Sequence, residues 1–233
     1  MAPAVSSDTE AVFQALRQEA LLVHGKWIVF RDVFANHQEE RLPLLQSADS
    51  TFFSLALYGM LDRATTDICR LTDSVKTGGQ DNMVLGQLVA SVEKDVAAAK
   101  ASGGDPSEVK SLEELLENLR ERFEDAKTEC VPLRQRRNKL LAHWDYKLAL
   151  KQSATPLPGI SRDLVQRNLR AIANFLNEYE KYLGTGLTLF YPSWGNAGRA
   201  LIYTLQMGEA YQRLSEKGEV PRLPYPPRSD DPL

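Results

Sequence analysis

A short basic segment near the middle of the chain holds the residue types needed to bind a phosphodiester and to move its protons. Its members are Arg134, Arg136, Arg137, Asn138, Lys139 and His143. A guanidinium suits phosphate because its planar fork donates two parallel hydrogen bonds and stays charged. An imidazole, with a free pKa of about 6.5, gives or accepts a proton near neutral pH. The segment therefore predicts RNA cleavage without a metal: a base deprotonates the ribose 2′-hydroxyl, and a cation stabilises the charge on phosphorus.

Helical spacing leaves open which arginine would act with the histidine. Arg136 and His143 are seven residues apart and fall on nearly the same face of an α-helix. Arg137 and His143 are six apart and diverge by about 120°, so they converge only by side-chain reach or at a helix irregularity. Asn138 could orient the imidazole or a phosphate oxygen. Asp145 could orient the imidazole if the helix ends nearby.

Less specific interpretations apply to the same residues. A basic run on a helix is most often a solvated face, and an acidic helix that could pair with it precedes this one. Arg70 and Asp73, spaced by three on another helix, predict a structural ion pair. The alternative is that these two side chains hold the basic segment or its counterpart in a dimer. His24 and His37 have no partner at ligand spacing, so surface or satisfied positions are expected, with no metal site and no cofactor.

The elements that must position the basic segment are predicted to be helices throughout. A seam spaced by three and four predicts a long first helix over residues 13–34. Pro43 and residues 47–50 break the pattern, and a second helix is predicted from about Thr51 to a turn at Gly78-Gly79. A third helix is predicted over residues 83–100.

The second half of the chain continues in the same way. A helix begins at Asp105-Pro106, and Pro132 is predicted to interrupt or kink it, which would place residues 134–137 near a helix N-terminus with anion affinity of its own. Ser161 caps a helix that reaches Leu183, and a last helix spans residues 197–217. No strand is expected. The fold prediction is an all-α bundle of long antiparallel helices, with one domain over residues 1–219 and a proline-rich, disordered tail over 220–233.

Composition limits the function classes. The 233 residues are 43% hydrophobic and carry a net charge of -3, which argues against a general nucleic-acid coat, so an anionic ligand needs a local basic patch. Cys69 and Cys130 are expected to be small buried hydrophobes rather than a disulfide or a metal site. No signal-peptide pattern and no membrane-length apolar run is present, so a cytoplasmic protein without membrane contact is expected.

Two motifs resemble the HEPN superfamily. Arg137-Asn138 followed by His143 fits its signature of an arginine, a polar residue and, after a short spacer, a histidine. The abortive-infection, AbiU-like branch is the closer resemblance. It is carried by the longer string Arg137-Asn138-Lys139, Ala142-His143 and Asp145, and by the segment Arg70-Leu71-Thr72-Asp73. The likeness runs from the first long helix to about Leu183.

This resemblance implies a HEPN-like helical bundle that forms a homodimer in which two motifs face one cleft. It implies a metal-independent endoribonuclease of a phage-defence or toxin–antitoxin system, with RNA as substrate and an antitoxin or other regulatory protein as a partner. Arg137, Asn138 and His143 match the catalytic positions, and Arg134, Arg136 and Lys139 would hold the RNA backbone. Arg70, Asp73 and Asp145 would support them. The alternative is a non-catalytic helical module that binds RNA, a nucleotide or a protein partner.

Overall fold

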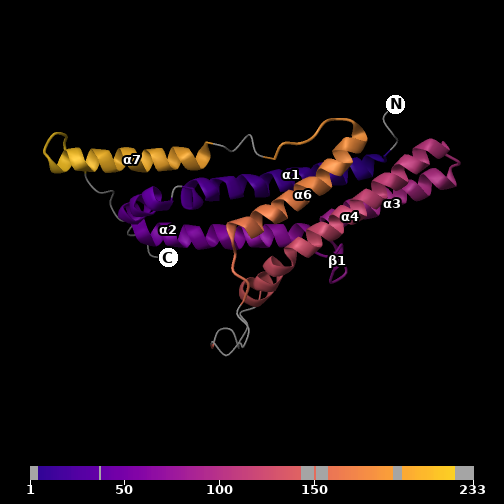
Figure 1. Ribbon diagram of the computed structural model, residues 1–233, viewed down its shortest axis with the longest axis horizontal. Helices are drawn as coiled ribbons and strands as arrows, with labels where there is room; N and C mark the ends of the chain where they lie inside the picture. The colour runs from indigo at the N-terminus through magenta and orange to yellow at the C-terminus, as the bar shows by residue number, and fades with distance from the viewer. Residues whose placement is uncertain (1–4, 37, 143–149, 151–156, 191–195, 224–233) are drawn as a thin grey trace.

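The protein is an assembly of long helices. The computed structural model describes residues 5–36, 38–142, 150, 157–190 and 196–223. Figure 1 shows α1 and α2 side by side, α3 and α4 as a second antiparallel pair, and α6 crossing α1 and running alongside α4. The predicted all-α class is confirmed. None of the described helices is long and apolar enough to cross a membrane.

The first pair consists of α1, Ser7–Phe30, and α2, Gln38–Leu71. A short π-helix, η1, Arg31–Ala35, ends the first helix. The predicted break at Pro43 is wrong, because the backbone stays helical there, whereas the break predicted at residues 47–50 is confirmed, because the backbone departs from helix at Asp49 (φ -168°, ψ 97°). The Asp49 carboxylate accepts the Phe52 N–H at 2.8 Å and so caps the second half of α2, which is the part predicted from Thr51.

A short β-hairpin with strands of two residues each follows α2. Strand β1, Lys76–Thr77, pairs antiparallel with β2, Gln80–Asp81. Gly78 and Gly79 between them both have positive φ, which a tight hairpin turn of this kind requires. The expectation of no strand is therefore wrong at this point, because two-residue strands are too short to show alternation.

The second pair consists of α3, Leu85–Ala101, and α4, Pro106–Arg136, which continues as a π-helix, η2, Arg137–Ala142. Helix α4 starts as predicted, with Asp105 capping the Ser107 N–H at 3.0 Å. Helix α6, Arg162–Leu183, is capped by Ser161, also as predicted, and α7 spans Ala197–Glu216. The last helix contacts α1, η1 and α2 at the end of the molecule away from α3 (Figure 1).

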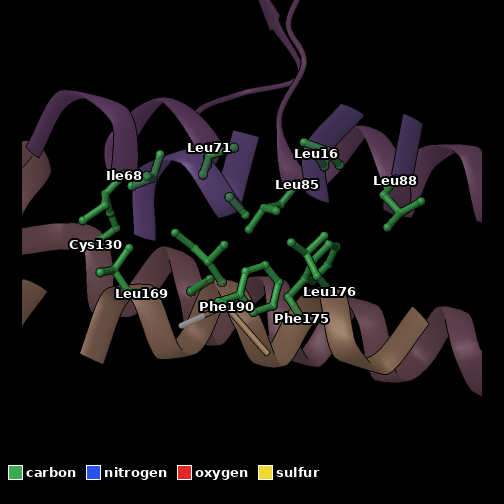
Figure 2. Close-up of a cluster of buried hydrophobic side chains, with 14 of the residues drawn as sticks. Leu16, Ile68, Leu71, Leu85, Leu88, Cys130, Leu169, Phe175, Leu176 and Phe190 are labelled. Atoms are coloured by element: carbon green, nitrogen blue, oxygen red, sulfur yellow. The ribbon is translucent and has the colours of Figure 1, made fainter. Parts of the chain in front are cut away.

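One apolar core joins α1, α2, α3, α4 and α6. Figure 2 shows Leu16, Leu71 and Leu85 meeting Leu169, Phe175 and Leu176 from the opposite side. The predicted seams of α1 and α6 are buried, apart from the half-buried Phe34 and Leu183 at their ends. Burial of this kind contributes about 1.5–3 kcal/mol for each large apolar side chain, so the core fixes how α2 and α4 lie against each other.

His24 lies inside this helical assembly and is 1% exposed. Its Nδ1 is 2.8 Å from the Ala20 carbonyl oxygen, and its ring stacks at 4.8 Å on Phe190. The satisfied position expected for it is confirmed, whereas His37 lies outside the described residues. Burial lowers the pKa of His24 and outweighs the backbone contacts of Ala20 and Leu169, which act to raise it.

His24 therefore makes folding stability fall in mild acid. The unfolded chain takes up a proton on this imidazole below about pH 6.5, whereas the folded chain does not, so the free energy of unfolding decreases as the pH drops through that window. Between about pH 7.5 and pH 5.5, we expect the free energy of unfolding to fall more steeply in the wild type than in His24→Gln. The difference in slope is at most about 1.4 kcal/mol per pH unit. Urea unfolding at several pH values measures it, and equal slopes for the two proteins would contradict it.

Candidate active site at the end of helix α4

The basic segment lies at the C-terminal end of α4. The prediction that Pro132 interrupts the helix, and that residues 134–137 sit at a helix N-terminus, is wrong, because α4 is continuous through Pro132. The buried neighbours Cys130 and Leu133 anchor this turn in the core, which offsets the one backbone hydrogen bond that proline removes. Residues 134–137 therefore lie inside a continuous helical stretch that runs through Ala142, and they lack the unpaired N–H groups of a helix N-terminus that would bind an anion.

The helix changes its winding at the segment itself. From Arg137 to Ala142 the backbone is a π-helix rather than an α-helix. Single π-turns are rare and often occur at functional sites. Face assignments that assume ideal α-helical spacing across this region, including those made for Arg136 and Arg137, therefore do not apply.

The carboxylate of Asp73 links two arginines of α4 to the end of α2. Arg137 Nη1 donates to Asp73 Oδ2 at 2.6 Å, and Arg134 Nε lies 3.4 Å from Asp73 Oδ1. The side chains of Arg137 and Asp73 are only 18% and 28% exposed. A charge-assisted bond at this depth is screened less than a surface ion pair, so it can hold a guanidinium in one place.

Thr72 adds a second contact between the same two helix ends. Arg134 Nη2 donates to the Thr72 carbonyl oxygen at 2.7 Å and to the Thr72 hydroxyl oxygen at 2.8 Å. That carbonyl group lies just past the last residue of α2, where helical carbonyls lack partners. Thr72 had no assigned role in the sequence interpretation, although it belongs to the segment Arg70-Leu71-Thr72-Asp73.

Arg137 is also held by the residue that follows it. Its Nε and Nη2 both donate to Asn138 Oδ1 at 3.1 Å. Burial acts to lower the pKa of Arg137, but the hydrogen bond and charge of Asp73 outweigh it, so the pKa is raised above its usual value. The guanidinium therefore stays charged, and with partners counted among the described residues alone, one N–H remains on each terminal nitrogen.

Arg136 and Lys139 differ from these two arginines. In the described part of the chain neither side chain forms an ion pair, and the Nε of Arg136 is buried without a hydrogen-bond partner. Asp73 contacts only Arg134 and Arg137, and with Arg136 and Lys139 on the same helical stretch the segment keeps a net positive charge. The acidic face of α4 does not neutralise it; Glu113 and Glu124, for example, pair with lysines near them.

Arg70 does not pair with Asp73, so the predicted ion pair at spacing three is wrong. Its guanidinium contacts Glu19 of α1, and it lies 3.9 Å from Asp67 one turn earlier. The reason is that α2 ends at Leu71, so Asp73 has left the helical face that Arg70 occupies. Asp73 instead makes the contact considered as the alternative, with the basic segment.

A hollow of about 580 Å³ opens beside this cluster. Its wall includes Glu19, Arg70, Asp73, Asn82 and Met83, from α1, the end of α2 and the hairpin region. A volume of this order accommodates a small ligand or one nucleotide. Asp73 is shared between the hollow and the arginine cluster, which places the two side by side.

Two of the predicted site residues, His143 and Asp145, lie outside the described residues. The structure thus brings together Arg134, Arg137, Asn138 and Asp73, and among the residues it describes Arg136 and Lys139 have no ion-pair partner. The sequence model of the HEPN_AbiU2 family, described as AbiU2, matches residues 6–191. The chain belongs to the AbiU2 family of HEPN proteins.

The AbiU2 match covers α1 to α6 and the whole basic segment, and α7 follows it in the chain. It confirms the resemblance drawn from Arg137, Asn138 and His143. No significant match is found among the curated proteins or the solved structures. Family membership supports an abortive-infection or ribonuclease-like module, and the roles of individual residues remain predictions.

The contact between Asp73 and Arg137 gives a measurable coupling energy. We expect a double-mutant cycle with Asp73→Ala and Arg137→Ala to give about 1–2 kcal/mol in the free energy of unfolding, because both groups are largely shielded from solvent. The pair Arg122–Asp125 on α4 is the control, at 3.4 Å and with 39% and 56% of its side chains exposed. The cycle for this exposed control pair should give a coupling energy of less than about 0.5 kcal/mol. Urea unfolding of the wild type, the single variants and the two double variants measures both cycles, and equal values for the two pairs would contradict the role given to Asp73.

Proposed function

We propose that this AbiU2-family protein is a metal-independent endoribonuclease of a phage-defence or toxin–antitoxin system. The observation that carries the proposal is the fixed guanidinium of Arg137, held by Asp73 just past the end of α2 and by Asn138 beside it in η2. The cations around it supply the charge that an RNA backbone requires.

The roles follow from the free hydrogen-bonding groups. Within the described part of the chain, Arg137 keeps one N–H on each terminal nitrogen, a pair that matches two oxygens of a phosphate. In the transition state of 2′-hydroxyl attack, negative charge grows on those oxygens, and a guanidinium fixed in advance stabilises it without reorganisation. Asn138 accepts from Arg137 through Oδ1, and its amide N–H groups, which donate to none of the described residues, would face the RNA or the imidazole.

His143 would supply the proton transfer. As a neutral imidazole it takes the proton of the 2′-hydroxyl, the 2′-oxygen attacks phosphorus, and the 5′-oxygen of the next nucleotide leaves with a proton. The products are a 2′,3′-cyclic phosphate and a free 5′-hydroxyl. Arg136 and Lys139, which lack ion-pair partners in the described chain, would bind neighbouring phosphates, and Arg134 would help to orient Asp73.

We also propose that the active form is a homodimer in which two such clusters face one cleft. In support, the described surface of α2 exposes large apolar side chains, namely Leu42, Phe52, Leu55 and Tyr58. Apolar groups gathered on one helix are typical of a protein–protein contact. An antitoxin or other regulatory protein is a further partner under this proposal.

The second candidate function is a binding module without turnover. The Asp73 carboxylate favours this binding function, because its negative charge partly neutralises Arg137, the arginine that would act on phosphate. In this case the same cluster and the adjoining hollow would hold RNA or a nucleotide. The two functions differ in what removal of the imidazole does.

Cleavage of a mixed RNA pool in EDTA separates the two functions. We expect the wild type to produce 2′,3′-cyclic phosphate ends, and His143→Ala and Arg137→Ala to lose about 100-fold or more of this activity. Arg136→Ala combined with Lys139→Ala should raise KM more than it lowers kcat, because these side chains bind the backbone.

The control is Arg167→Ala, which removes an exposed arginine of α6 that pairs with Glu129 and Asp163. It should cleave as the wild type does. Equal cleavage by every variant would assign the activity to a contaminant or another site. RNA binding without cleavage by a dimeric wild type would favour the binding module.

A further inference from the structure

Two buried thiols touch each other between α2 and α4. The sulfur atoms of Cys69 and Cys130 are 3.6 Å apart, and both residues are 0% exposed. Figure 2 shows Cys130 inside the core beside Ile68 of α2 and Leu169 of α6. The chain has no other cysteine. The expected burial is confirmed, and the structure adds that residues 61 positions apart in sequence form a thiol pair.

The thiol pair lies one helical turn from the arginine cluster. Cys69 precedes Thr72 by three residues, and Cys130 precedes Arg134 by four, so each thiol shares a helix face with one partner of the Thr72–Arg134 contact. The Thr72 hydroxyl also donates to the Cys69 carbonyl oxygen at 3.2 Å. A movement that brings the two sulfur atoms together therefore acts directly on the ends of α2 and α4.

We propose that Cys69 and Cys130 are a redox modification site: a peroxide oxidises them to an intramolecular disulfide, and the bond displaces Thr72 and Asp73 relative to Arg134 and Arg137. The disulfide is independent of the function proposed above, whereas its effect on cleavage rests on that function. The chemical class of the oxidant is a hydroperoxide, of which hydrogen peroxide is the smallest.

The chemistry balances in two steps. The thiolate of one cysteine attacks a peroxide oxygen, the O–O bond breaks, and a sulfenic acid forms while the released hydroxide takes up a proton as water. The sulfur of the other cysteine attacks the sulfenic sulfur, the S–S bond forms, and the S–O bond breaks as a second water leaves with the thiol proton. Two thiols and one hydrogen peroxide thus give one disulfide and two waters, with two electrons passing from sulfur to peroxide.

The surroundings favour Cys130 as the attacking group. The hydrogen bond with Cys69 lowers the pKa of Cys130 to about 7, aided by the Thr72 hydroxyl and the charge of Arg134, and burial opposes them. The same hydrogen bond, together with burial, raises the pKa of Cys69. A buried pair with one ionisable thiol reacts when local opening admits a molecule about the size of water, and its partner is already in place to resolve the sulfenic acid.

The bond changes the geometry because a disulfide is shorter than the present contact. An S–S bond is about 2.0 Å long, so the sulfur atoms must approach by about 1.6 Å. Side-chain rotation supplies part of this approach, and the packed helices supply the rest. A displacement of about 1 Å at a catalytic group can reduce a rate 100-fold.

The test begins with the modification itself. Purified protein is treated with hydrogen peroxide, and the intact mass and the thiol content after denaturation are measured with and without later dithiothreitol. We expect the wild type to lose both thiols and about 2 Da, reversibly and without covalent dimers. Cys69→Ser and Cys130→Ser should form no such bond, and Cys69→Ala and Cys130→Ala serve where serine prevents folding. Retained thiols, or a disulfide between two chains, would overturn the proposal.

The coupling to the arginine cluster is tested on the same samples. Hydrogen exchange of the backbone amides over residues 72–73 and 134–138 should be faster in the oxidised protein, and dithiothreitol should reverse the change. Cleavage of RNA by the oxidised protein should be at least about tenfold slower than by the reduced protein. Unchanged exchange in a fully oxidised sample would overturn the coupling. Changed exchange with no cleavage by the reduced wild type would instead count against the proposed function.

Discussion

The carboxylate of Asp73 is the constraint on which the site depends. It stands where α2 has just ended, and it takes hydrogen-bond or ion-pair contacts from two arginines that stand where α4 ends. Without it, Arg137 would be a long side chain at a helix terminus with many rotamers open to it. With it, the guanidinium is held in one direction, and two of its N–H groups have no partner among the residues that the structure describes. The helical framework can be understood as the means by which Asp73 and Arg137, 64 positions apart in sequence, meet.

The apolar core stabilises the fold, whereas the polar contacts position the site. Stability comes from the large apolar side chains that α1, α2, α3, α4 and α6 bury together. The contacts of Thr72 and Asp73 with Arg134 and Arg137 lie at the rim of that core and contribute little more than a kilocalorie or two each. Their effect is positional, since they fix the rotation of the α4 terminus against α2. The π-helix begins at Arg137, the last residue of α4 and η2 that contacts Asp73.

Much of the fold could be predicted from sequence because its signals are local. The seams of α1 and α6, and the caps at Asp105 and Ser161, depend on neighbours within a few residues, and the structure has them as expected. The turn at Gly78-Gly79 was predicted, but the strands beside it were not, because two residues are too few to show alternation. The helical path through Pro132 and the π-helix could not be predicted, because tertiary packing decides them. The same holds for the site. Arg137 and Asn138 were found by residue type and spacing, whereas the partners Asp73, Thr72 and the thiol pair depend on α2 meeting α4.

We propose that Asp73 acts in RNA cleavage only through Arg137. The most direct test is the single-turnover cleavage rate of the wild type, Asp73→Ala, Arg137→Ala and the double variant. If Asp73 only positions the guanidinium, Asp73→Ala slows cleavage, and the double variant is no slower than Arg137→Ala alone. A wild-type rate for Asp73→Ala, or two losses that multiply in the double variant, would contradict the account.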